Sequence, residues 1–544
     1  MNPAQLLAQF HRIGEAPDAF RSLRRFILDL AVRGKLVKQD LREEPASELL
    51  KQIKDQKMQL VNGNKLRGNT TTTPIESEEG HFPIPASWMR VQFGEVMISR
   101  DGERVPVSKE DRNQRKKMYD YYGASGVIDK IDNYLFDKPL LLIGEDGANL
   151  ISRSTPIAFI ARGKYWVNNH AHVLDGISED FLRFIELHIN AIDLKPYVTG
   201  AAQPKMNQAK MNSIPLALPP LAEQHRIVAK VDELMALCDR LEAAQTERES
   251  RRDRLVASSL NRLNNGADPD AFREHARFYF NHLPRLTTRP DHIKQLRQTI
   301  LNLAVRGKLV PQVETMNVGY RSGTLATQWK PSDKIADTKP NSEIQSNIPP
   351  FPLPHGWKWA RVSDVLITRQ GVQIPKEQQL SVEKQGYKRY LYISDFRHDD
   401  KLKFVIDQFP TKEVTEEDLV MANTAGPGEV FRGVPGILSN NLFKIAFDRL
   451  LFTQNYLFIF FTSPIFISAV QAELKGGAQQ HLGHKLMGKQ FVAIPPLAEQ
   501  HRIVAKVDEL MALCDQLETQ LTTTQTESHN LLSSLLHHTL TQVI

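Results

Sequence analysis

Two short segments come close to the motifs of nucleotide and cofactor chemistry, and each lacks a necessary residue. Gly483 to Gln490 (GHKLMGKQ) has nearly the spacing of a phosphate-binding P-loop, but Gln490 stands where a Ser or Thr should hold magnesium. Asn347 to Phe351 (NIPPF) resembles the Asn-Pro-Pro-aromatic signature of amino-methyltransferases, but an Ile interrupts it and no glycine-rich cofactor loop precedes it. Gly144 to Gly147 (GEDG) is typical of a turn, and no nucleophile, base and orienting group can be assembled into a triad. We therefore expect a chain that binds without catalysing and holds no cofactor of its own.

Cations beside aromatic and amide side chains suit a nucleic-acid surface, because cations meet phosphates while amides and aromatics reach base edges. A solvated charged loop is the alternative for each single residue. Two stretches of the chain carry such side chains. The DNA-binding candidates of the first are Arg112, Arg115, Lys116, Lys117, Tyr121, Tyr122, Asn168, Asn169, His170 and Lys205. Those of the second are Lys388, Arg389, Tyr390, Arg397, His398, Lys401, Gln479, His481 and Lys485.

A metal site is an alternative for the run from Trp166 to His172 (WVNNHAH), which contains two imidazoles. The run has no obvious carboxylate partner at ligand spacing, so we assign no metal. We expect its amides and imidazoles to lie at the edge of a strand.

The elements that must position these residues are marked by an internal repeat. Pro219 to Glu242 (PPLAEQHRIVAKVDELMALCDRLE) recurs at Pro495 to Glu518, with Arg240 against Gln516 as the only difference. Ile27 to Val37 (ILDLAVRGKLV) returns as Ile300 to Val310 (ILNLAVRGKLV). The segments between these constant frames diverge and share only sparse punctuation, such as Pro85 and Trp88 against Pro354 and Trp357. Recent duplication alone would have kept the inserts similar too, so we infer different targets for the inserts and one kind of partner for the frames.

The longer frame segment predicts a rod. Its apolar positions alternate in steps of four and three, which is the heptad seam of a coiled coil. We expect a helix over 221–262, stopped by Asn264, Asn265 and Gly266, and an antiparallel partner in the C-terminal copy. The Thr-rich stretch 519–526 is poor helix material. The predicted helix and partner interface is Leu221, Ile227, Val231, Leu234, Cys238 and Leu241, with Leu497, Ile503, Val507, Leu510, Cys514 and Leu517.

The shorter frame segment predicts a helix with Asp18 or Asp291 as its N-cap and Gly34 or Gly307 just past its end. Cations follow at its C-terminal end: Arg33, Lys35, Arg306 and Lys308. They contact either phosphates or a partner, or they favour the negative end of the helix dipole; the sequence leaves both readings open.

Composition sets the remaining limits. The chain has 544 residues, a net charge of +6, 41% hydrophobic residues and two cysteines. These values predict several soluble domains, no disulfide framework, and a weak preference for an anionic partner. No apolar run approaches a membrane span and the first residues lack a signal peptide, so we expect no membrane contact and a cytoplasmic protein.

The predicted fold class is α+β (mixed α/β), with two globular inserts separated by two long antiparallel helices in an internal pseudo-twofold repeat. The expected domains are an N-terminal helical region (1–60), a flexible linker (61–80), insert 1 (81–218), a central region (219–312, with helices at 221–262 and 291–306), a second linker (313–350), insert 2 (351–494) and a C-terminal helix (495–544). Short β-rich runs, such as Pro139 to Ile143, Pro156 to Ile160 and Leu438 to Ile445, lie in the inserts.

The frames resemble those of the specificity subunits of type I restriction-modification enzymes, through Leu28 to Val37 (LDLAVRGKLV), Glu44 to Leu50 (EPASELL) and Pro219 to Ala229 (PPLAEQHRIVA). The resemblance implies that each insert is a target recognition domain reading one half of an interrupted site in double-stranded DNA. It also implies two modification (methyltransferase) subunits that use S-adenosylmethionine, and restriction subunits that use ATP and Mg²⁺. The alternative is an adaptor of the same architecture in another phage-defence or methyltransferase-only system.

Overall fold

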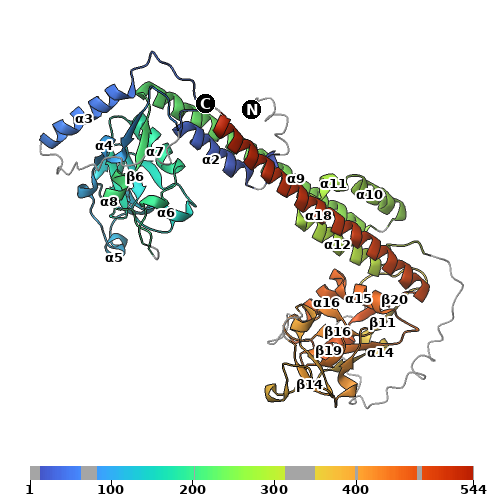
Figure 1. Cartoon of the computed structure of the whole chain (residues 1–544). Helices are drawn as coiled ribbons and strands as arrows, with labels where there is room; N and C mark the ends of the chain where they lie inside the picture. Colours follow the sequence, from blue (N-terminus) through green and yellow to red (C-terminus); the bar gives the residue numbers. More distant parts are fainter. Residues whose placement is uncertain are drawn as a thin grey trace. The chain divides into compact units, whose positions relative to one another are not determined.

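The computed structural model describes residues 13–16, 18–62, 83–200, 203–266, 268–312, 349–398, 402–474 and 481–542. The chain divides into two compact units (Figure 1). Unit 1 comprises Met1–Arg248 and Thr524–Ile544, and unit 2 comprises Glu249–Thr523. Each unit holds one insert and a set of frame helices, and each is described by itself.

The frame of unit 1 contains α2 (Ala19–Val32), α3 (Ala46–Asn62), the first part of α9 (Leu221–Asn265) and the last part of α18 (Leu497–Gln542). The helix predicted over 221–262 therefore extends to Asn265, directly before Gly266. Asp18 does occupy the N-cap position of α2, but with φ of 57° its side chain makes no capping hydrogen bond.

The frame of unit 2 contains the rest of α9, then α10 (Pro269–Asn281), α11 (Leu283–Leu286), α12 (Pro290–Val305) and the first part of α18. Asp291 is not an N-cap as predicted, because α12 begins one residue earlier and Arg289 takes that position. The Thr-rich stretch stays helical: the Thr519 and Thr522 hydroxyls each donate to the carbonyl four residues earlier at 2.9 Å. The last turns of α9 and the first turns of α18 share one core, as an antiparallel pair requires.

The proline and tryptophan that the two inserts share lie against a glycine of the frame. Pro85 and Trp88 lie against Gly34, and Pro354 and Trp357 lie against Gly307. Both glycines have positive φ, 69° and 67°. A Cβ at Gly34 would lie 2.5 Å from Pro85 Cγ, and one at Gly307 would lie 2.4 Å from Pro354 Cγ. Each glycine therefore ends a frame helix and also admits the first residues of an insert against it.

The cations after α2 and α12 bind the C-terminal ends of the long helices. Lys35 Nζ donates to the Leu540 carbonyl at 2.7 Å, near the end of α18. Lys308 Nζ donates to the Gly266 carbonyl at 2.5 Å, and Arg306 donates to the Asn264 carbonyl at 2.9 Å, at the end of α9. The cations thus satisfy carbonyls that another helix leaves open at its C-terminus.

The described residues of insert 1 form ten strands in three sheets. β1 (Met89–Gln92) pairs antiparallel with β10 (Pro215–Leu218) and closes the insert on its frame. One four-stranded sheet has the order β2-β9-β6-β7 and the other β4-β3-β8-β5. The remaining bounds are β2 Ile98–Ser99, β3 Tyr119–Gly123, β4 Gly126–Ile131, β5 Phe136–Asp137, β6 Leu140–Gly144, β7 Ala158–Ala161, β8 Lys164–Val167 and β9 Ala171–Asp175. Short helices are η1 Asp101–Glu103, α4 Phe93–Val96, α5 Lys109–Asn113, α6 Asn149–Ser152, α7 Glu179–Ala191, η2 Lys195–Tyr197 and α8 Gln208–Asn212.

Insert 2 repeats this topology strand for strand. β11 (Lys358–Arg361) pairs with β20 (Phe491–Ile494), and the sheets have the orders β12-β19-β16-β17 and β14-β13-β18-β15. The predicted run Leu438 to Ile445 is divided between two strands in different sheets, β18 and β19. The other bounds are β12 Leu366–Gln370, β13 Tyr387–Leu391, β14 Phe404–Ile406, β15 Glu413–Val414, β16 Leu419–Ala422, β17 Val430–Arg432, β18 Gly436–Leu438 and β19 Leu442–Phe447. The helices are α14 Val362–Val365, η3 Lys376–Gln378, η4 Ile393–Phe396, η5 Pro410–Lys412, α15 Gln454–Thr462, α16 Pro464–Leu474 and α17 His484–Lys489. The mixed α+β class with two repeated sheet domains is confirmed.

In the part of the chain that the structure describes, no single helix is long and apolar enough to cross a membrane, whereas α15 and α16, bent by 56°, pass that test of length and composition only as a pair.

Candidate nucleic-acid interface

Three loops of insert 1 meet at one end of its strands. They are residues 145–147 after β6, residues 168–170 between β8 and β9, and residues 203–206 before α8. The Glu145 N–H donates to the His170 carbonyl, and the Met206 N–H donates to the Glu145 carbonyl, both at 2.8 Å. Backbone hydrogen bonds therefore join all three loops into one surface, the first loop edge.

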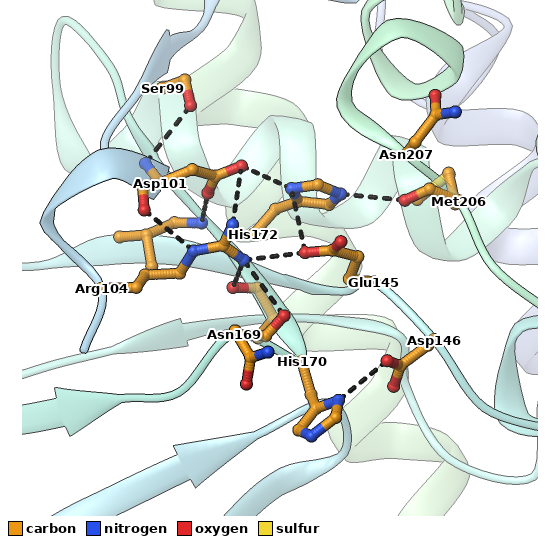
Figure 2. Close-up of polar contacts among 12 residues, drawn as sticks. Ser99, Asp101, Arg104, Glu145, Asp146, Asn169, His170, His172, Met206 and Asn207 are labelled. Carbon is orange, nitrogen blue, oxygen red and sulfur yellow. Dashed lines mark hydrogen bonds and ion pairs between the residues drawn. The ribbon is translucent and has the colours of Figure 1, made fainter. Parts of the chain in front are cut away.

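A buried histidine lies beneath this edge (Figure 2). His172, on β9, is 1% exposed. Its Nδ1 lies 2.6 Å from Asp101 Oδ2, and its Nε2 lies 2.9 Å from the Met206 carbonyl oxygen. An ionised carboxylate and a carbonyl can only accept, so both ring nitrogens donate and the imidazole is positively charged. Burial lowers the pKa of His172, but the hydrogen bonds and charges of its partners outweigh burial and raise that pKa above its ordinary value.

Arg104 and Glu145 complete the buried network. Arg104 Nη1 donates to Glu145 Oε2 at 2.8 Å and to the Ala171 carbonyl at 2.7 Å, and Nη2 lies 3.5 Å from Asp101 Oδ2. Burial raises the pKa of Glu145, but Arg104, His172 and Lys205 together lower it below its ordinary value. Two cations and two carboxylates thus tie η1 to the first loop edge, which we expect to hold the loops in place before any ligand binds.

Three of the predicted DNA contacts lie exposed on the first loop edge: Asn169, His170 and Lys205. Lys205 Nζ lies 3.2 Å from Glu145 Oε1. Asn168 is 5% exposed, and its Oδ1 accepts from the His170 N–H at 2.8 Å. Asn168 therefore shapes the loop, while the other three present polar groups to solvent. Asn168, Asn169 and His170 lie in the connection between β8 and β9, whereas His172 lies within β9, inside a sheet, so the predicted place at a strand edge is wrong for His172.

The predicted basic run of insert 1 is not part of this edge. It precedes the first residue of β3, whereas the Tyr122 carbonyl near the last residue of β3 accepts from the Asn168 N–H. The cations of the run face carboxylates: Arg112 and Lys117 lie 2.9 and 2.8 Å from Asp129 oxygens. Their hydrogen bonds hold the pKa of the Asp129 carboxyl well below its usual range.

Arg115 makes a longer ion pair than Arg112 and Lys117 do. Arg115 Nη1 lies 3.6 Å from Asp132 Oδ1, and Lys116 is exposed.

Two predicted tyrosine contacts are wrong. Tyr121 and Tyr390 are each 1% exposed, because both face the core of their insert. The Tyr121 hydroxyl donates to the Val107 carbonyl at 3.3 Å, and the Tyr390 hydroxyl donates to the Val372 carbonyl at 2.6 Å. Tyr122, which is half-buried, packs against Phe159 and Tyr165 with ring centroids 5.9 and 5.5 Å apart.

Insert 2 has an equivalent surface, the second loop edge, made by residues 423–426, 439–441 and 481–483. The Asn423 N–H donates to the Asn441 carbonyl at 3.1 Å, and the Leu482 N–H donates to the Asn423 carbonyl at 2.9 Å. The predicted contacts His481 and Lys485 are exposed at or beside this edge. Gln479 and Lys401, also predicted, lie outside the described residues.

The remaining cations predicted in insert 2 have carboxylate partners. Lys388 Nζ lies 2.7 Å from Glu413 Oε1 and 3.2 Å from Asp407 Oδ2. Arg389 lies 3.0 Å from Asp395, Arg397 pairs with Glu429, and His398 is exposed. Carboxylates therefore neutralise most of the cations in the predicted basic stretch.

Sequence reasoning missed the acidic half of the site. Asp101, Glu145 and Asp146 come from segments far from the two histidines, so no local spacing could reveal them. The carboxylates of Asp146 and Asp101 contact His170 and His172 although neither stands at ligand spacing from them in the sequence. Among the residues that the structure describes, no group of three or more His, Cys, Asp or Glu is arranged to hold a metal ion.

The predicted helix interface divides by burial. Leu221 is 38% exposed, so it is not buried between helices of this chain, and its predicted contact with a partner stays a prediction. The other seam residues of α9 are buried or half-buried in a core shared with α2 and insert 1. Their counterparts Ile503, Val507 and Cys514 are buried in the core of unit 2, and Leu497, Leu510 and Leu517 are half-buried.

A family model described as the type I restriction modification DNA specificity domain matches residues 85–249 and 354–524. Each match runs from the first residues of an insert along the frame helix that follows it. The chain belongs to this family, and it is a DNA-recognition subunit that does not itself catalyse.

Characterised relatives match along almost the whole chain. The specificity subunit of the type I restriction enzyme EcoAI from Escherichia coli is 26% identical over 94% of this chain and 92% of its own length. That of EcoEI, also from Escherichia coli, is 25% identical over 95% of this chain and 93% of its own length. Among solved structures, the HsdS subunit from Thermoanaerobacter tengcongensis matches 86% of this chain and all of its own, at 17% identity and a TM-score of 0.43.

Proposed function

We propose that this subunit reads the two halves of an interrupted site in double-stranded DNA, one half with each loop edge. The observation that carries the proposal is that the two inserts share ten strands in the same order while their loop edges have different residues. A constant scaffold with variable loops is how one fold presents two different recognition surfaces. The polar groups on the first loop edge are of the kinds that pair with bases and phosphates.

Exchange of residues 81–218 for the insert of another family member tests this proposal. We expect one half of the methylated sequence to change while the other half and the spacing stay. Sequencing of methylated adenines in cells that carry the exchanged gene and its partner genes measures both halves at once. If both halves changed together, the assignment of one half to each insert would be wrong.

We further propose that two methyltransferase subunits, which use S-adenosylmethionine, bind the frames, and that ATP- and Mg²⁺-dependent restriction subunits join them. Support comes from exposed residues of α9 that recur in α18. Ala222, His225, Ala229, Asp232 and Glu233 are exposed, and so are their identical counterparts Ala498, His501, Ala505, Asp508 and Glu509. Packing explains identity at buried positions but not at exposed ones, whereas two contacts with one kind of partner explain both.

The mass of the assembled complex measures the number of partners. We expect Ala229→Arg and Ala505→Arg each to lose one methyltransferase subunit, and the double variant to lose two. Ala243→Arg is the matched control, because Ala243 is exposed on the same helix beyond the identical block, where Thr519 is its counterpart. Loss of both partners from a single variant would contradict two separate sites.

A further inference from the structure

We propose that His170, held by Asp146, reads one base pair of the first half-site by accepting a hydrogen bond from a base amino group. This inference rests on the proposed function of insert 1 and adds the chemical class of the base that it selects.

Figure 2 shows His170 and Asp146 joined to each other on the first loop edge. His170 Nδ1 is 2.8 Å from Asp146 Oδ2. The His170 side chain is 51% exposed, and that of Asp146 is 18% exposed. An ionised carboxylate only accepts, so Nδ1 carries the hydrogen. In the neutral ring Nε2 is then an acceptor.

Hydrogen bonds hold the backbone of both His170 and Asp146. The His170 N–H donates to Asn168 Oδ1 at 2.8 Å, and its carbonyl accepts from the Glu145 N–H at 2.8 Å. Asp146 forms a β-bridge with Lys205, and the neighbouring Gly147 N–H donates to the Pro204 carbonyl at 3.0 Å. Because the backbone on both sides is fixed, little conformational entropy is lost when the ring meets a base.

A hydrogen-bond acceptor at this position distinguishes bases that present a donor from bases that present an acceptor. In the major groove adenine offers its N6 amino group and cytosine its N4 amino group, whereas guanine and thymine offer acceptors there. Nε2 would bind either amino group and would meet a lone pair on guanine O6 or thymine O4. One such contact discriminates by roughly tenfold, within the range of about 1 to 3 kcal/mol for a good base contact.

Among the described residues of the second loop edge, no histidine is paired with a carboxylate in this way. Asn441 takes the place of His170, since its carbonyl accepts from Asn423 as that of His170 accepts from Glu145. The base selection proposed for His170 is therefore confined to one half of the DNA site.

The test uses the assembled complex with its methyltransferase subunits and a DNA library in which each base of both half-sites is varied. For His170→Ala we expect the preference at one position of one half to fall about tenfold, with every other position unchanged. For Asp146→Asn we expect the side-chain amide to donate to Nδ1, which makes Nε2 a donor and moves the preference at that position to guanine or thymine. Glu179→Gln is the matched control: Glu179 Oε1 accepts from exposed Arg162 at 2.7 Å, beyond the opposite ends of β7 and β8, and should change no preference.

Each outcome decides the assignment. An unchanged preference in His170→Ala, or an equal loss at all positions of the half-site, would overturn base reading by His170. A wild-type preference for guanine at the His170-dependent position would show a protonated ring that donates, and would overturn the acceptor. An Asp146→Asn complex with the wild-type preference would overturn the role of Asp146. A wild-type complex that methylates no two-part site contradicts the proposed function itself and not only this inference.

Discussion

The two inserts place very different side chains at the same point of the same fold. His172 on β9 pairs across the sheet with Ile143 on β6, and Phe443 on β19 pairs with Met421 on β16. His172 lies in a network of buried charges, whereas Phe443 is fully buried with its ring 5.4 Å from that of His484. An apolar residue therefore serves the scaffold equally well at this position. The charged network of insert 1 is not needed for the topology, and we attribute it to the loop edge above it.

Removing His172 from the buried charge network of insert 1 should cause the largest loss of stability. His172→Phe gives insert 1 the residue that insert 2 has, but leaves Arg104 as the one buried cation that contacts both Asp101 and Glu145 in the described network. We expect the free energy of opening of insert 1 to fall by about 3 kcal/mol, because removing one partner of a buried ion pair leaves an uncompensated charge.

Phe443→Leu is the matched change in insert 2, and it should lower the corresponding free energy by about 1 kcal/mol through lost packing. Hydrogen exchange of peptides from each insert in the full chain measures both values. Equal losses in the two inserts would show that the charges do not hold insert 1 together.

The pH dependence of folding stability should be the next largest difference between the two inserts. Because the folded-state pKa of His172 is raised, its contribution to stability is fully present below the unfolded pKa of about 6.5 and is lost as pH rises through the folded value. His188, which is fully buried in the same insert, acts in the opposite direction: burial lowers its pKa to about 4, so it destabilises the fold as pH falls below about 6.5.

His188 is present in both wild type and His172→Phe, so its pH-dependent contribution drops out of the difference in stability between them. We expect this difference for insert 1 to shrink as pH rises from about 6 to about 9. Hydrogen exchange, corrected for intrinsic rates, reports it. A difference that grew with pH would mean that His172 is neutral in the folded protein.

Replacing Tyr121 or Tyr390, which are equivalent in the two inserts, should cause a smaller loss of stability than His172→Phe, and the same loss in each insert. Tyr121 also accepts from the Val107 N–H at 3.1 Å, and Tyr390 from the Ile374 N–H at 3.3 Å. Burial raises the pKa of Tyr390 to about 12, so its hydroxyl stays protonated. We expect Tyr121→Phe and Tyr390→Phe each to destabilise its insert by about 1 to 2 kcal/mol, since each change removes one donated and one accepted hydrogen bond, as measured by urea unfolding. A large effect in one insert alone would contradict their equivalence.

The frames could be predicted well from the sequence because their signals are local. The seam spacing predicted α9, and Gly34 and Gly307 lie just past their helices as expected. Helix starts were less certain, as the shift of α12 from Asp291 to Pro290 shows. The helicity of the Thr-rich stretch of α18 was underestimated because Leu517 and Leu521 pack against the core of unit 2, and tertiary packing outweighs weak helix propensity.

The candidate site could be predicted only in part. Asn169, His170 and Lys205, named from the sequence as polar or basic residues, are exposed on the first loop edge, and their contact with DNA stays a prediction. The basic run was overvalued, since Asp129 lies on β4, across the sheet from the strand that follows the run. Tyr121 and Tyr390 were misassigned because alternation along a strand does not say which face is buried.

By itself the sequence determined the repeat, the helical frames and the two divergent inserts, because identity and periodicity are properties of neighbouring residues. Only the tertiary structure decided which carboxylate meets which cation. Asp101 and His172 are 71 residues apart and meet at 2.6 Å, because β2 and β9 pair in one sheet. Charge and hydrogen bonding act over a few ångströms in space, and the pairing of strands, not spacing along the chain, sets those distances.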